Sequence, residues 1–200
     1  MRPFVIAALA IAGVIGAASA APLVAPVKRP AEIERIKFLT PALAPMPYTV
    51  FCQRYKDECR IQPRFRGDQV QLTEERWSDL KEINGLVNRS IIPVGERSDV
   101  WKIEPDRGDC DDYAVTKRHL LHHHGWPLAA LLLSEVVTDW GEHHLVLVVR
   151  TDRGDWVLDN LTQQVNPWTR APYQWVRTQM PNKGFWTTIA NPDKRMPPSM

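Results

Sequence analysis

The sequence predicts an α+β domain in which helices precede an antiparallel β-sheet. Two helix-type segments come first: residues 73–91 carry apolar side chains at helical spacing, and residues 110–124 follow a glycine turn. Leucine-rich and β-branched runs separated by turn residues follow from residue 129 onward. This order of segments predicts helices packed on one antiparallel sheet.

Length and composition fit one domain. The chain has 200 residues, of which 44% are hydrophobic, enough to bury a sizeable core. Its formal net charge is +2 at pH 7 and it has no basic block, so neither nucleic acid nor a strongly polyanionic partner is predicted. We find no internal repeat and expect a single domain over residues 48–190.

Residues 1–20 have the features of a secretory signal peptide. Arg2 gives a positive start, residues 4–16 form an apolar run, and residues 18–20 (Ala-Ser-Ala) match a small-residue cleavage site. The apolar run is too short to span a membrane comfortably, which disfavours the alternative of an uncleaved anchor. We therefore expect export to the periplasm or out of the cell, with no membrane anchor after cleavage.

Both ends of the mature chain are expected to lie outside the core. Residues 21–47 contain six prolines, which block helix and central strand, so this segment should run extended along the surface or be partly disordered. Residues 191–200 are polar and proline-rich and should be loose.

Cys52 and Cys59 lie seven residues apart. In an oxidising compartment, two cysteines at this spacing favour a small disulfide loop. The alternative, a pair of metal ligands, lacks a nearby second ligand pair for zinc. We predict the disulfide, which leaves Cys110 as a free thiol.

The segment over residues 73–91 is predicted to be the first long helix. Thr73 is a capping residue, and Glu74 and Glu75 place negative charge in the first turn. Its apolar stripe indicates core packing and not a cofactor site, and Pro93 ends the helix.

Cys110 is the candidate nucleophile, because it lies where the turn at Gly108 opens onto a helix. Unpaired N–H groups and the positive end of the helix dipole favour the thiolate there, and the thiolate is the attacking form. Three flanking aspartates give the thiol a polar setting, which disfavours the alternative of a buried structural cysteine.

His122, His123 and His124 near the end of this helix suggest a metal site. Adjacent helical residues point in three directions, however, and imidazoles near a helix C-terminus also suit the dipole. We therefore expect no metal there, and Gly125 and Pro127 end the helix.

His144 is the candidate base. It begins a β-branched and leucine-rich run over residues 144–149, which predicts a buried strand. Side chains alternate along a strand, so the neighbouring His143 points to the opposite face. Only one of the two histidines can therefore face Cys110.

Asp159 is the candidate orienting acid, at the end of the next predicted strand. With a four-residue hairpin tip at residues 151–154, Asp159 faces Val146. It then lies on the same face as His144, about 7–8 Å away at the backbone and within side-chain reach. A two-residue tip at residues 153–154 would place the two side chains too far apart.

Together these motifs resemble the bacterial transglutaminase-like cysteine peptidases, a family that includes the LapG-like periplasmic proteases. The resemblance covers roughly residues 73–186 and depends on three blocks that are specific in combination: residues 108–114, 144–147 and 158–160. It implies a papain-like fold in its transglutaminase variant. It also implies that Cys110 is the nucleophile, His144 the base and Asp159 the orienting acid.

Asp109, Asp111 and Asp112 surround Cys110 with negative charge, which should raise the pKa of its thiol. A divalent cation would remove this conflict, and carboxylates at a turn are hard oxygen ligands suited to Ca²⁺. The resemblance implies calcium at Asp109 and Asp111. The alternative is that the aspartates cap the N-terminus of the helix and form salt bridges with Arg107 or Arg118.

The predicted function is an exported, calcium-assisted cysteine endopeptidase that acts on a protein substrate through an acyl-thioester. Two alternatives stay open: a transglutaminase or amidase, since an amine can replace water as acceptor, and a non-enzymatic binding module on the same fold. The resemblance favours the peptidase. It further implies a large surface adhesin as substrate and an inner-membrane receptor that senses cyclic di-GMP as partner.

Overall fold

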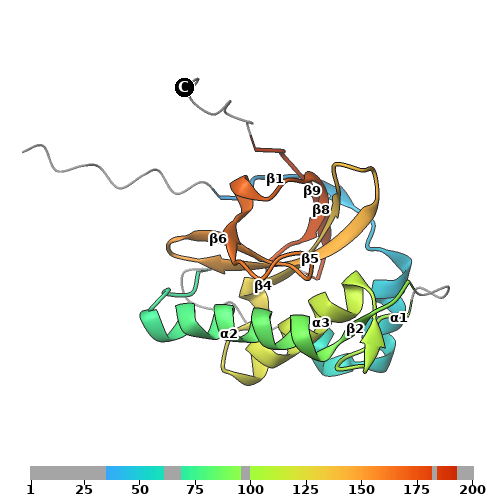
Figure 1. Cartoon of the computed structure of the whole chain (residues 1–200). Helices are drawn as coiled ribbons and strands as arrows, with labels where there is room; N and C mark the ends of the chain where they lie inside the picture. Colours follow the sequence, from blue (N-terminus) through green and yellow to red (C-terminus); the bar gives the residue numbers. More distant parts are fainter. Residues whose placement is uncertain (1–34, 61–68, 96–99, 182–183, 193–200) are drawn as a thin grey trace, which may run out of the picture. The chain divides into compact units, whose positions relative to one another are not determined.

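A computed structural model of the chain describes residues 35–60, 69–95, 100–181 and 184–192 (Figure 1). All of them belong to a unit that spans residues 33–200. The predicted signal peptide, most of the predicted proline-rich segment and residues 193–200 lie outside the described residues. Among the described helices, none is both long enough and apolar enough to span a membrane.

The helices occupy the first half of the described chain, as the sequence predicts. They are α1 (Met46–Arg54), α2 (Glu74–Ser90) and α3 (Cys110–His123), with short 3₁₀ turns η1 (Lys56–Cys59), η2 (Leu128–Ala130) and η3 (Trp168–Arg170). The Thr73 hydroxyl caps α2 by accepting the Arg76 N–H at 3.2 Å. After α3, Gly125 has φ +82°, a left-handed conformation that glycine adopts without strain.

Within the described residues, seven strands form one sheet in the order β1–β9–β8–β4–β5–β6–β7, and every neighbouring pair is antiparallel. The strands are β1 (Phe38–Ala42), β4 (Leu131–Val137), β5 (His143–Thr151), β6 (Gly154–Leu158), β7 (Asn166–Pro167), β8 (Gln174–Gln179) and β9 (Trp186–Ile189). A separate parallel pair, β2 (Ile92–Pro93) and β3 (Arg107–Gly108), leads into α3. This arrangement confirms the predicted α+β class.

The core has two parts, one on each face of the central strands. Leu145, Leu147 and Val149 of β5 pack with the buried side chains of α2 and α3. Val146 and Val148 point the other way and join a second cluster around Trp168 and Trp175. Figure 1 shows the three helices on one side of the sheet. Strand β5 therefore connects the helical side of the molecule to the opposite face.

The segment before residue 48 contains more regular structure than its prolines suggest. Strand β1 is extended, as predicted, and lies at an edge of the sheet, where Pro41 is tolerated. The start of α1 at Met46 differs from the predicted extended segment. Pro47 fits there because the first helical turn needs no N–H donors, and Phe51 of α1 is 1% exposed in the core.

Cys52 of α1 and Cys59 of η1 are joined by a disulfide. At the other end of the described chain, the start of the predicted loose tail is held to the sheet. The Trp175 N–H donates to Asn191 Oδ1 at 2.7 Å.

Candidate active site

Cys110 is the first residue of α3, directly after the β3 strand that approaches the helix. A side chain at Gly108 is excluded, because a Cβ there would lie 2.1 Å from Asp112 Oδ2 and 2.7 Å from Asp112 Cβ. The glycine in this motif thus permits the close approach that places Cys110 at the helix N-terminus. The Leu145 N–H of β5 is directed at the Cys110 sulfur.

His144 immediately precedes Leu145, so the strand that contacts the sulfur also carries the candidate base. His144 is 6% exposed, and its Nε2 lies 2.9 Å from Asp159 Oδ1. Because Nε2 is engaged by the carboxylate, Nδ1 is the ring nitrogen that stays available to another partner. His143 behaves differently: its side chain is 70% exposed and contacts Glu135 at 2.7 Å. The predicted opposite orientation of the two histidines is confirmed.

The hairpin register that brings Asp159 to His144 is the one predicted. Arg150 pairs with Asp155 and Leu147 with Leu158, which places Asp159 opposite Val146. The tip itself is shorter than expected, because Thr151 and Gly154 also pair and leave only residues 152–153 unpaired. Gly154 has φ +115°, a conformation that favours glycine at this tight turn.

Asp159 is held by more donors than His144 alone. The Tyr173 hydroxyl donates to Asp159 Oδ2, and the Leu161 N–H donates to Oδ1 at 3.0 Å. Burial opposes ionisation of this carboxyl, but the hydrogen bonds from His144, Tyr173 and Leu161 outweigh it and lower its pKa. Asp159 therefore stays ionised and can fix the imidazole tautomer.

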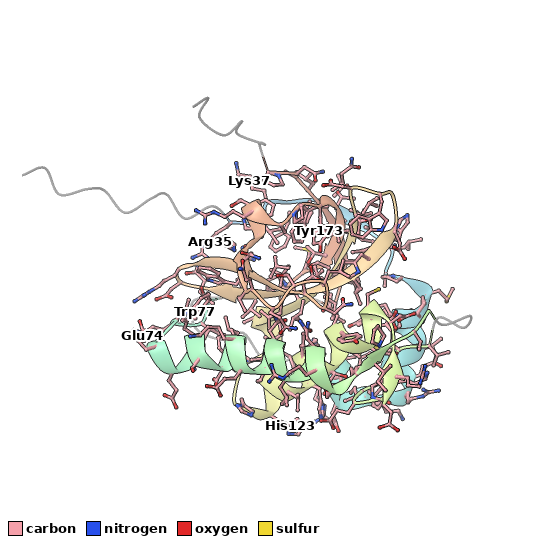
Figure 2. The ribbon with its side chains drawn as sticks, viewed as in Figure 1. Arg35, Lys37, Glu74, Trp77, His123 and Tyr173 are labelled. Atoms are coloured by element: carbon pink, nitrogen blue, oxygen red, sulfur yellow. A yellow bond between two sulfur atoms is a disulfide. The ribbon has the colours of Figure 1, made fainter. Side chains whose placement is uncertain are left out.

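Tyr173 and Asn88 are positioning residues for which sequence reasoning found no role. Tyr173 precedes β8, lies on the sheet side of the molecule (Figure 2), and its ring is 5.6 Å from the His144 ring. Asn88 of α2 donates from Nδ2 to the Asp159 carbonyl at 2.9 Å. Both contacts join segments distant in sequence, so no local pattern could indicate them.

The thiol is protonated at rest. Burial is the largest cause that raises the pKa of the Cys110 thiol, and the charges of Asp111 and Asp109 raise it further. Hydrogen bonds from the N–H groups of Leu145 and Asp111 lower it in part, and the resulting pKa is about 12. The sequence predicted the charge conflict, but it did not predict that burial is the larger cause. A base next to the sulfur is therefore needed for attack.

The predicted calcium ligands divide into two groups. Carboxylate oxygens of Asp109 and Asp111 and the Cys110 sulfur all lie within 4.8 Å of one another, and the described residues contain no second cluster of this kind. Asp112 lies apart from that cluster, is fully buried and accepts the Lys102 N–H at 2.6 Å. Two hard carboxylate donors beside a partly exposed turn fit a calcium site completed by backbone carbonyls or water.

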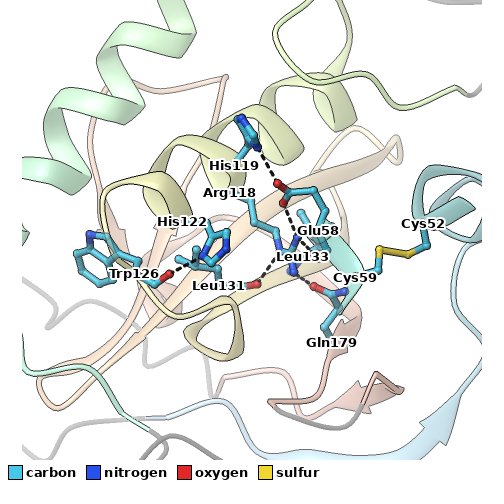
Figure 3. A network of polar contacts seen from close by, with 10 residues as sticks. All are labelled: Cys52, Glu58, Cys59, Arg118, His119, His122, Trp126, Leu131, Leu133 and Gln179. Carbon is cyan, nitrogen blue, oxygen red and sulfur yellow. Dashed lines mark hydrogen bonds and ion pairs between the residues drawn. A yellow bond between two sulfur atoms is a disulfide. The ribbon is translucent and has the colours of Figure 1, made fainter. Parts of the chain in front are cut away.

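Arg118, one of the two arginines named in the alternative interpretation, pairs with Glu58 and not with the aspartates. Its Nη1 donates to the Glu58 carbonyl at 2.6 Å and to Glu58 Oε2 at 3.0 Å, and its Nε donates to the Leu131 carbonyl at 3.2 Å. His119 Nδ1 contacts the other Glu58 oxygen at 2.6 Å (Figure 3). Since Glu58 precedes the disulfide-bonded Cys59, the loop that the disulfide closes holds the helix that carries Cys110.

Lys117 is the other buried cation of α3. It is 0% exposed, and among the described residues its Nζ has no hydrogen-bond partner. The Tyr113 ring centre lies 5.9 Å from Nζ. Burial lowers the pKa of the Lys117 ammonium to about 7, although the charge of Asp159 opposes this shift.

Comparisons with known proteins identify the family and the fold. The family model described as bacterial transglutaminase-like cysteine proteinase matches residues 39–194. Calcium-bound Legionella pneumophila LapG is 19% identical, with a TM-score of 0.51 over 75% of this chain and 83% of that one. EGTA-treated LapG is 18% identical, with a TM-score of 0.50 over 74% of this chain and 84% of that one. A search of curated proteins finds no match. Since the family match spans well over half of the chain, the protein belongs to the bacterial transglutaminase-like cysteine proteinases and is a cysteine peptidase.

Proposed function

We propose that the protein is an exported cysteine endopeptidase that cleaves a protein substrate through Cys110, His144 and Asp159. One observation carries this proposal. The His144–Asp159 pair, joined at 2.9 Å, lies at the end of the strand whose next N–H is directed at the Cys110 sulfur. These two contacts support a Cys110–His144–Asp159 arrangement of the kind that acyl transfer uses.

The protonation states define the role of each residue. Because the thiol pKa is high, His144 removes the proton from Cys110 as the sulfur attacks the peptide carbonyl. The ionised Asp159 stabilises the resulting imidazolium and holds its orientation. The Cys110 N–H, at the start of α3, is the proposed donor to the oxyanion. The imidazolium then protonates the leaving amine, and water hydrolyses the thioester.

We further propose that calcium binds at Asp109 and Asp111. The proximity of these carboxylates supports it, as does the calcium-bound state of the similar LapG. A bound Ca²⁺ would offset negative charge beside the sulfur and so lower the thiol pKa. We expect iodoacetamide to alkylate Cys110 faster with Ca²⁺ than with excess chelator at neutral pH. Asp109→Asn together with Asp111→Asn should abolish the difference, and an equal rate with and without Ca²⁺ in the unchanged protein would contradict the proposal.

The endopeptidase assignment is tested on a proteome-derived peptide library. The mature protein should create new peptide N-termini that mass spectrometry identifies. Cys110→Ala and His144→Ala should create none, and Asp159→Asn should lower the rate by on the order of 10⁴-fold, as in other triads. Cleavage that persists in Cys110→Ala would contradict the assignment.

The acceptor separates this proposal from the transferase alternative. A labelled primary amine added to the reaction should stay free if water is the acceptor, whereas its covalent capture at the acyl site would favour a transglutaminase or amidase.

Three further predictions come from the family resemblance and stay predictions. They are a large surface adhesin as substrate, a receptor that senses cyclic di-GMP as partner, and a periplasmic location. If the protein were instead a non-enzymatic binding module, Cys110→Ala would leave the cellular phenotype unchanged.

A further inference from the structure

A cavity of about 300 Å³ lies beside Asp159, the hydrogen-bond partner of His144, and the proposed triad chemistry does not use it. Asp159 and Tyr173 form part of its lining, so it is continuous with the residues that orient the imidazole. Val157 and Pro172 contribute apolar surface. The volume is at the lower end of the range for ligand sites, which suits one or two amino-acid side chains.

Two large apolar side chains line this cavity and are exposed to solvent. Trp140 is 67% exposed and Leu161 is 52% exposed. The indole of Trp140 is nevertheless held, because its Nε1–H donates to Glu142 Oε2 at 2.8 Å. An oriented, exposed tryptophan next to a reactive site is typical of a recognition surface and unfavourable in water without a partner.

Both residues are placed by the same segments that place the triad. Trp140 belongs to the turn between β4 and β5, which leads directly to His144. Leu161 follows Asp159 by two residues, and its N–H donates to the Asp159 carboxylate at 3.0 Å. The cavity is therefore fixed relative to the His144 ring.

The chemistry of the wall selects an apolar occupant. Asp159 is the only ionisable carboxylate among the described lining residues, and its oxygens already accept from His144, Leu161 and Tyr173. Thr162 and Asn166 add polar but uncharged groups to the lining. A charged substrate side chain would therefore lose hydration there without gaining an uncompensated opposite charge. Leucine, methionine and aromatic side chains would instead bury apolar surface against Trp140 and Leu161.

The position of the cavity indicates which part of the substrate enters it. His144 returns its proton to the leaving amine, so the amine side of the cleaved bond lies toward His144 and away from the Cys110 sulfur. The cavity lies on the Asp159 side of His144. We propose, given the endopeptidase function above, that Trp140 and Leu161 form a specificity subsite for an apolar side chain within the first few residues after the scissile bond.

The peptide library tests this subsite directly. Wild-type cleavage should enrich leucine, methionine or aromatic residues at one fixed position after the scissile bond. Trp140→Ala and Leu161→Ala should remove that enrichment and lower kcat/KM for such peptides by about tenfold or more, mainly through KM. Leu161→Asp should shift the preference toward lysine and arginine. Phe185→Ala is the matched control, because Phe185 is 66% exposed and not among the residues that line the cavity.

Failure of the subsite and failure of the peptidase function give different results. Alkylation of Cys110 by iodoacetamide should proceed at wild-type rate in Trp140→Ala, which shows that the variant is folded and its thiol accessible. Trp140→Phe, which keeps an aromatic ring, should retain the preference. If wild type cleaves but its preference survives in Trp140→Ala and Leu161→Ala, the subsite is refuted while the function stands. If wild type shows no Cys110-dependent cleavage, the function itself fails.

Discussion

At the scale of single residues, Cys110 combines a reactive position with a thiol that resists ionisation. The thiol pKa is raised to about 12, so the thiolate fraction is small throughout the neutral range. We predict that the rate of Cys110 alkylation without calcium rises close to tenfold per pH unit between pH 7 and pH 10, without a plateau. Iodoacetamide labelling followed by mass spectrometry measures this rate, and Cys110→Ser is the control. A plateau of the alkylation rate near pH 8 would contradict the prediction, because it would mean that the Cys110 thiol has an ordinary pKa.

Lys117 should reduce stability at neutral pH, because it is a buried ammonium without a hydrogen-bond partner among the described residues. Its pKa in the folded protein, about 7, is below its ordinary value of 10.5, so the unfolded chain binds more protons between these two values. The free energy of unfolding should therefore rise with pH from 7 upward. We predict that Lys117→Met is more stable than wild type at pH 7 and lacks this rise.

Urea unfolding from pH 7 to 9 tests the Lys117 prediction. A Cys110→Ser background is needed, because the raised thiol pKa has the opposite effect on stability above about pH 9. Lys81→Met, on the exposed face of α2, is the matched control and should behave like its parent. If the free energy of unfolding depends on pH equally in Lys117→Met and its parent, the prediction is contradicted. The Lys117 ammonium would then be stabilised in the folded protein.

At the scale of secondary-structure elements, α3 depends on a contact with the disulfide loop. The Arg118–Glu58 pair is buried, with side chains 5% and 7% exposed. Removing the charge of Glu58 leaves the Arg118 guanidinium uncompensated, which typically costs about 3–5 kcal/mol. We predict that Glu58→Gln lowers the free energy of unfolding by about 3 kcal/mol, or the melting temperature by about 6–12 °C.

A nearby exposed ion pair provides the control for Glu58. Asp57 contacts Arg60 at 2.9 Å, but its side chain is 87% exposed. Asp57→Asn should therefore stay within about 0.5 kcal/mol of wild type in the same thermal and urea experiments. Equal stability of Glu58→Gln and Asp57→Asn would exclude the proposed support of α3.

The elements that the sequence predicts well are those with local signals. The Thr73 cap and the Gly125 end are properties of a few adjacent residues. Strand periodicity likewise shows that His143 and His144 face opposite ways, whereas the choice of His144 came from the family resemblance. The hairpin register is different, because the sequence allows two registers and only the one that pairs Arg150 with Asp155 brings Asp159 to His144.

Contacts between distant segments could not be predicted in this way. Glu58 reaches Arg118 across 60 positions, and Asn88 reaches the Asp159 carbonyl across 71. The burial of Lys117 likewise depends on what packs against α3 and not on its neighbours in sequence. Charge near Cys110 was visible in the sequence, whereas the larger effect of burial on its pKa required the fold.

At the scale of the whole folded unit, the proposed mechanism depends on the meeting of two layers. Helix α3 brings Cys110 from the helical side, and the β5–β6 hairpin brings His144 and Asp159 from the sheet. Tyr173, before β8, and Asn88, on α2, then hold the Asp159 end of the hairpin from both layers. A change that separates the layers should therefore abolish acyl transfer even when all three residues are intact.

The most direct test of this account is to trap the acyl-enzyme. The mature protein with Ca²⁺ is mixed with a cleavable peptide, quenched in acid within one turnover, and analysed by intact mass and peptide mapping. We predict a peptide acyl group linked as a thioester to Cys110, lost on treatment with hydroxylamine and absent in His144→Ala. An acyl group on any other residue, or turnover that persists in Cys110→Ala, would contradict the account.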